Sequence, residues 1–99
     1  MIDKIKSENM DLLFEAILTL ETTDDCYRFF DDLCTSIELK AFAQRLHVAK
    51  LLDEQRVYNS IVTETGASTA TISRVNRSLK DGNDGYRIVF DRLKKKGLM

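Results

Sequence analysis

Hydroxyl and arginine side chains suited to binding a polyanion gather in residues 68–80, whose sequence is STATISRVNRSLK. Hydroxyl groups hydrogen-bond to phosphates and base edges, and an arginine grips a guanine edge or a phosphate with two donors. This combination predicts contacts to double-stranded DNA. The candidate DNA-binding residues are Ser68, Thr69, Ala70, Thr71, Ser73, Arg74, Arg77 and Lys80.

Two helices joined by a glycine turn are predicted to position these side chains. The first helix is expected over about residues 58–64, with Gly66 in the turn because glycine adopts a positive φ without steric cost. Ser68 or Thr69 can cap the second helix by accepting a hydrogen bond from a free N–H group. Thr71 is expected to be exposed on the polar face of that helix. The apolar positions expected to pack together are Ile61 and Val62 in the first helix and Ile72, Val75 and Leu79 in the second.

This arrangement is typical of a helix-turn-helix, in which the second helix enters the major groove of B-DNA. A helical hairpin whose polar face is only solvated has the same spacing. The serine and threonine residues at the start of the second helix favour the DNA interpretation. An ordinary solvated helix more often carries Glu, Lys and Gln there, because these residues form helices more readily.

Charge is distributed unevenly along the chain, although its net value over 99 residues is only −1. Residues 1–55 contain 6 Lys and Arg against 12 Asp and Glu, whereas residues 56–99 contain 9 against 4. The basic half includes the predicted DNA-binding segment, so the phosphate field would orient that half toward DNA. The lysines at 94–96 are better explained as a solvated helix end.

The apolar periodicity predicts helices throughout a single domain, 1–99. Thr23 is expected to cap the second helix, and the segment Thr35–Glu38 (TSIE) is a capping-box pattern that opens a third helix to about Leu52. A last helix is expected to follow, with Ile88, Val89, Phe90 and Leu93 as its apolar positions. The predicted organisation is a dimerisation core over 1–55, a helix-turn-helix reading head over 57–80 and a C-terminal helix over 84–96.

The first and third predicted helices have more apolar faces than a chain of this size can cover by itself. A small domain buries a limited fraction of its surface, and a second subunit is a common source of further cover. We therefore expect a homodimer.

Residue patterns of enzymes, metal centres and membrane proteins are absent from the sequence. His47 is the only histidine, and it is expected to be an ordinary partly buried or surface residue. Cys26 and Cys34 are too few and too widely spaced for a metal cluster, and they are expected to be reduced core thiols. No apolar run could span a membrane, and residues 1–10 lack the apolar core of a signal peptide. We expect no catalysis, no metal, no cofactor and a cytoplasmic location.

The chain resembles the Trp repressor family, and the six-helix plan extends that resemblance over most of its length. The strongest match is GASTATISRVNRSLK, residues 66–80, which is similar to the glycine turn and reading helix of the family. A weaker match is LCTSIELKAFAQRL, residues 33–46. The resemblance implies an all-α, intertwined homodimer that reads a palindromic operator as a repressor. It is closer to a Trp-repressor-like branch than to the tryptophan-sensing repressor.

In the tryptophan-sensing members, the amino acid lies between core and reading head. The resemblance implies Thr35, Arg45, Arg74 and Ser78 as the matching ligand-binding positions. One residue departs from the pattern, because Val75 occupies the place of a glycine that leaves space for the indole ring. We therefore expect no L-tryptophan binding, and the identity of any other corepressor stays open.

Two functions of different kinds fit these observations. The first is a sequence-specific, homodimeric transcriptional regulator. The second is a dimeric helical interaction module that kept the fold without specific DNA binding. The absence of acidic residues among positions 69–80 favours the regulator, because an acidic face would repel phosphates.

Overall fold

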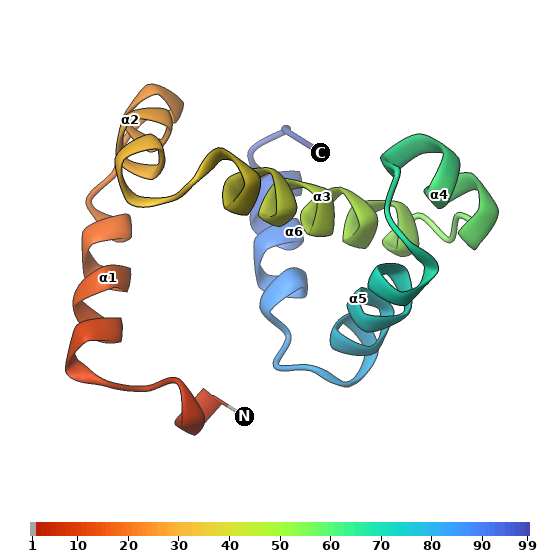
Figure 1. The fold of residues 1–99 in the computed structure, drawn as a ribbon, viewed down its shortest axis with the longest axis horizontal. Coiled ribbons are helices and arrows are strands. Elements are labelled where there is room, and N and C mark those ends of the chain that lie inside the picture. Colours follow the sequence, from red (N-terminus) through yellow and green to blue (C-terminus); the bar gives the residue numbers. More distant parts are fainter. Residues whose placement is uncertain (1) are drawn as a thin grey trace. The chain divides into compact units, whose positions relative to one another are not determined.

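The computed structural model describes residues 2–99, which form helices and no strands (Figure 1). This agrees with the all-α prediction. The elements are the short 3-10 helix η1 (Ile2–Lys4), then α1 (Glu8–Leu18), α2 (Thr23–Leu33), α3 (Ser36–Asp53), α4 (Tyr58–Thr65), α5 (Thr69–Asp81) and α6 (Gly85–Lys95). The chain divides into two compact units, one up to Leu39 and one from Lys40 to Met99. The division into a dimerisation core over 1–55 and a reading head over 57–80 stays a prediction.

The N-cap of helix α2 lies one residue earlier than predicted. Thr22, not Thr23, is the N-cap, and its hydroxyl accepts a hydrogen bond from the Asp25 N–H at 3.0 Å. The backbone of Thr22 is extended, whereas Thr23 is already helical. The Asp25 carboxylate in turn accepts a hydrogen bond from the Glu21 N–H at 3.1 Å. The hydrogen bond from the Asp25 N–H places the cap at Thr22, the first of the two threonines.

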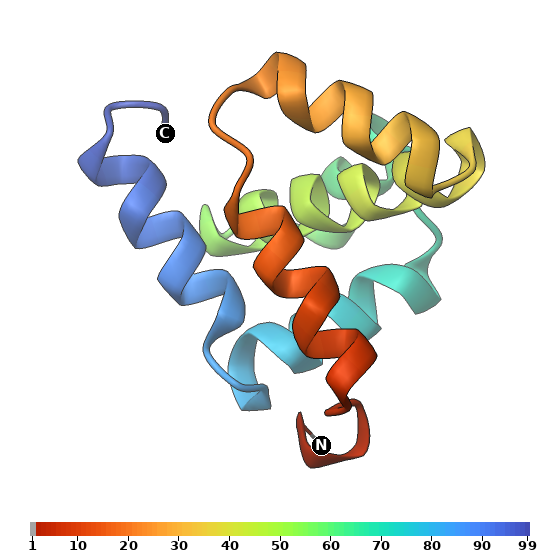
Figure 2. The same cartoon turned by 90° about the vertical axis from the view of Figure 1, so that its left-hand side faces the viewer.

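The N-terminal unit has little apolar core of its own. No residue of α1 or α2 is fully buried. Large apolar side chains instead reach solvent, with Leu12 68% exposed, Leu18 76% exposed and Ile37, at the start of α3, 79% exposed. An edge-to-face pair of Phe29 and Phe30, with ring centroids 5.5 Å apart, is the clearest apolar contact within α2. Figure 2 shows α1, in red, followed along the chain by α2, in orange.

Helix α3 opens with the predicted capping box. The hydroxyl of Thr35 accepts a hydrogen bond from the Glu38 N–H at 3.1 Å, and the Glu38 carboxylate accepts one from the Thr35 N–H at 2.9 Å. Two N–H groups that would otherwise lack partners at the helix start are thereby satisfied. The hydrogen bond from the Thr35 backbone holds the pKa of Glu38 below its ordinary value.

The C-terminal unit packs α4, α5 and α6 against the second half of α3 (Figure 1). Apolar residues at spacings of three and four bring one face of each helix into the same core, as the periodicity predicts. Its fully buried members are Val48, Ala49, Leu51, Ile61, Ala67, Ile72, Val75 and Phe90.

Helix α6 buries only part of its apolar sequence. Phe90 is buried, and the Tyr86 ring stacks on it with centroids 6.0 Å apart. Ile88 and Val89, two other apolar positions of this helix, are exposed. Asp53 at the end of α3 forms ion pairs with two α6 cations, Arg87 and Lys94, which orient the helix. No helix within residues 2–99 has both the length and the hydropathy to cross a membrane.

Candidate nucleic-acid interface

The turn between α4 and α5 is built as the sequence predicts. Gly66 has a φ of +71°, and its N–H donates to the Val62 carbonyl at 2.8 Å. The hydroxyl of Thr65 donates to the Ile61 carbonyl at 2.7 Å and accepts a hydrogen bond from the Ala67 N–H at 3.1 Å. Because Ala67 is buried directly after the turn, the chain enters α5 in a defined direction.

The first turn of α5 is capped by Ser68, whose hydroxyl accepts a hydrogen bond from the Thr71 N–H at 3.1 Å. The Ser68 hydroxyl also donates to the Thr71 hydroxyl at 3.1 Å. Thr71 is half-buried, so the expectation that this side chain is exposed is wrong. The cause is the cap, which draws the Thr71 hydroxyl back toward the turn.

The outward face of α5 carries most of the predicted DNA-binding residues. Ile72 and Val75 point into the core, and the residues on the other side of the helix are exposed. The exposed candidates are Ser68, Thr69, Ala70, Ser73, Arg74, Arg77 and Lys80. At 100° per residue, Ala70, Ser73 and Arg77 lie close together on this face. Short side chains near the N-terminus are therefore followed by cations toward the C-terminus.

The cations of this face are available to a ligand. None of the ion pairs among residues 2–99 includes Arg74, Arg77 or Lys80. Asp81 is the last residue of α5. It lies one helical turn beyond Arg77 and is the only acid in the helix, so its carboxylate partly offsets the positive charge at the C-terminal end.

Four polar side chains join α3 to the helix-turn-helix. We call them the α3–α4 clasp: Gln44, His47, Arg56 and Glu64. Gln44 Nε2 donates to the Thr65 carbonyl at 3.2 Å. The Glu64 carboxylate accepts a hydrogen bond from Arg56 Nη2 at 3.1 Å and lies 3.2 Å from His47 Nε2. The Arg56 hydrogen bond, followed by weaker effects of Arg56 and His47, lowers the pKa of Glu64. Sequence patterns missed these contacts because the partners on different helices are 17 and 21 residues apart.

The residues predicted from the family resemblance to hold a ligand do not form a polar cluster within the C-terminal unit. The guanidinium of Arg45 lies 5.9 Å from the centre of the Phe42 ring. Arg74 and Ser78 are exposed on α5, and neither Arg45 nor Arg74 belongs to an ion pair among residues 2–99. Thr35 belongs to the N-terminal unit, where its hydroxyl is part of the capping box. Val75 is 3% exposed and is a member of the core.

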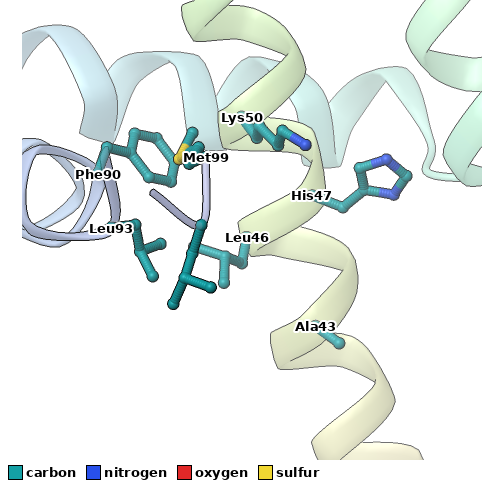
Figure 3. A pocket seen from close by; sticks show the side chains of 8 residues that line it. Ala43, Leu46, His47, Lys50, Phe90, Leu93 and Met99 are labelled. Atoms are coloured by element: carbon teal, nitrogen blue, oxygen red, sulfur yellow. The ribbon is translucent and has the colours of Figure 1, made fainter. Parts of the chain in front are cut away.

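An open apolar cavity of about 260 Å³ lies between α3 and α6. Phe90, Leu93 and Met99 line one part of it, whereas the imidazole of His47 points away from these three residues (Figure 3). No group of three or more His, Cys, Asp and Glu side chains within residues 2–99 is placed to hold a metal ion. Cys26 and Cys34 are free and partly buried.

Residues 8–94 match the family model of the Trp repressor protein. The chain belongs to the Trp repressor family. This is a family of regulators rather than enzymes, and its fold is that of DNA-binding proteins.

Members and structural neighbours of the Trp repressor family match nearly the whole chain. The uncharacterised protein YerC of Bacillus subtilis (strain 168) is 56% identical over 93 residues, which cover 94% of this chain and 89% of YerC. A TrpR-like protein from Eubacterium eligens ATCC 27750 has 54% identity and a TM-score of 0.90, covering 93% of this chain and 95% of its own. A solved structure from Staphylococcus aureus has 52% identity and a TM-score of 0.91, covering 95% and 94%. The six-helix prediction is thereby confirmed.

Proposed function

We propose that this protein is a sequence-specific transcriptional regulator that binds double-stranded DNA through α4 and α5 and acts as a repressor. The observation that carries the proposal is the outward face of α5. Among residues 2–99, Arg74, Arg77 and Lys80 have no ion-pair partner, and they are exposed in the helix that follows the Gly66 turn and the Ser68 cap. A helix that reads DNA needs unpaired cations and a fixed orientation, and a helix that is only solvated needs neither.

The proposed assembly is a homodimer that reads a palindromic operator. The exposed Leu12, Leu18 and Ile37 side chains of the N-terminal unit support it, because a second copy would remove them from water. A two-fold dimer presents two identical α5 helices, and such a pair matches a DNA site with the same symmetry.

Selection of bound fragments from randomised DNA tests this function. We expect the purified protein to enrich a palindromic sequence whose half-sites are about one helical turn apart. The enriched duplex should bind at least about a thousandfold more tightly than random DNA of equal length at the same salt concentration.

The alternative function, a dimeric interaction module without specific DNA binding, makes the opposite prediction. Such a protein would enrich no sequence, and any binding to DNA would be equally weak for all duplexes. The same selection therefore distinguishes the two proposals.

A further inference from the structure

The hydrogen bond from Gln44 to the Thr65 carbonyl connects two parts of the fold that no local interaction joins. Thr65 is the last residue of α4, and the last four carbonyls of an α-helix have no partner within the helix. Gln44 Nε2 lies 3.2 Å from this carbonyl and donates to it from the middle of α3. The contact is partly buried, so water competes for it less than at an open surface.

The position of this carbonyl gives the hydrogen bond a directional effect. The Thr65 carbonyl belongs to the peptide plane that leads into Gly66, whose φ of +71° reverses the chain toward α5. Holding that plane restricts the rotation at Gly66, where glycine itself offers little restriction. Ala67, buried on the other side of the turn, holds the chain from the core. The entry direction of α5 is therefore fixed from both sides.

Glu64 supplies a second connection one residue earlier. Its carboxylate lies 3.2 Å from His47 Nε2 on α3 and accepts a hydrogen bond from Arg56 at 3.1 Å. Arg56 also donates to the Ser60 hydroxyl at 2.7 Å, so it lies along α4. The end of α4 is thus joined to α3 at two successive residues.

We propose that the α3–α4 clasp positions the reading helix for sequence recognition, with Gln44 as its principal positioning residue. This inference rests on the proposed function and adds what controls its selectivity. Base reading needs α5 in one orientation, and affinity falls in proportion to the fraction of molecules that hold it. Binding to phosphates tolerates other orientations, because it depends mainly on charge. Loss of the clasp should therefore weaken operator binding more than binding to random DNA.

The principal test is the substitution Gln44→Met, which keeps the length and helix propensity of the side chain but removes its N–H donors. Operator affinity should fall about two- to tenfold, the range that one net hydrogen bond supports. Affinity for a random duplex of the same length and the salt dependence of binding should stay unchanged. Both titrations are made at a temperature where circular dichroism shows the two proteins to be fully folded.

A parallel test weakens the second connection, which Glu64 makes to His47 and Arg56. Glu64→Gln weakens the contacts to Arg56 and His47, and Glu54→Gln, at an exposed position outside the clasp, is its control for the change of charge. Both variants gain affinity for all DNA through the lost negative charge. Only Glu64→Gln should lower the ratio of operator affinity to random-DNA affinity.

Hydrogen exchange without DNA separates the clasp from the proposed function. Amides of residues 66–72 should exchange faster in Gln44→Met than in the wild type, while those of α2 stay unchanged. Equal exchange in the two proteins, or a parallel loss of operator and random-DNA affinity, would overturn the clasp. If the wild type selects no DNA sequence, the proposed function fails, and the exchange comparison still decides whether the clasp orders the turn.

Discussion

Ser68 and Thr71 are joined by two hydrogen bonds at the start of α5. The Ser68 hydroxyl accepts one from the Thr71 N–H and donates one to the Thr71 hydroxyl, both at 3.1 Å. The Thr71 hydroxyl is therefore part of the helix cap. The main role of Ser68 is thus in helix stability, whereas Thr71 takes part in the cap and also lies at the predicted interface.

Substitution at these two positions should separate stability from DNA binding. Thr71→Asp should abolish operator binding, because it places a carboxylate near the phosphates, yet leave the free energy of unfolding nearly unchanged, since acids are favourable in the first helical turn. Ser68→Ala should lower that free energy by about 1 kcal/mol through loss of the cap. Chemical denaturation and DNA titration measure the two effects. Operator binding retained by Thr71→Asp would place the reading surface elsewhere.

Arg77 and Lys80 should act as phosphate contacts rather than base readers. Replacing either with alanine should weaken binding to operator and random DNA alike, and should lower the slope of log affinity against log salt by about one. Lys95→Ala, at the end of α6, is the matched control and should leave the slope unchanged. A loss confined to the operator would instead assign base contacts to Arg77 or Lys80.

L-tryptophan at millimolar concentration should change neither the melting temperature nor the operator affinity. Val75 is 3% exposed and belongs to the core, so it leaves no space at this position of α5. Val75→Gly should lower the free energy of unfolding by roughly 2–4 kcal/mol, through lost apolar burial and a glycine within a helix. Calorimetric titration of the wild type measures binding directly. A saturable signal at micromolar tryptophan would contradict the prediction.

Sedimentation equilibrium at micromolar concentration should give about twice the chain mass of 11.4 kDa. Leu18→Glu should shift the equilibrium toward monomer, because it would bury a carboxylate in the expected subunit interface. Val57→Glu is the control, because Val57 is 70% exposed but lies at the start of the helix-turn-helix. A folded wild-type monomer would exclude the dimeric arrangement.

Acid should weaken the start of α3 through Glu38. The hydrogen bond from the Thr35 backbone lowers the pKa of Glu38 in the folded protein relative to the unfolded chain. Its stabilisation is therefore complete above the ordinary glutamate pKa and is lost as pH falls through the lowered folded value. Glu38→Gln keeps the capping hydrogen bond without titrating. The melting temperature of this variant should fall less than that of the wild type between about pH 6 and pH 3.

The sequence by itself determined the helices, the turn and the exposed candidates on α5. Three sequence signals act within one or two turns of helix. They are Gly66, the Thr35–Glu38 capping box and the three-residue spacing of Ile72 and Val75. Local signals of this kind are legible because the interacting groups are neighbours in the chain. Their limit is visible in α2, where two adjacent threonines could each serve as the cap and the structure uses the first.

Only the tertiary structure decided how the helices are held together. Gln44 reaches Thr65 across 21 residues and Arg87 reaches Asp53 across 34, and no periodicity links such pairs. The same applies to Ile88 and Val89, whose exposure follows from the rotation that α6 adopts when Phe90 fills the core. Side-chain packing and hydrogen-bond geometry choose among several apolar faces that the sequence leaves equivalent. That choice orients α5, and with it the surface proposed to meet DNA.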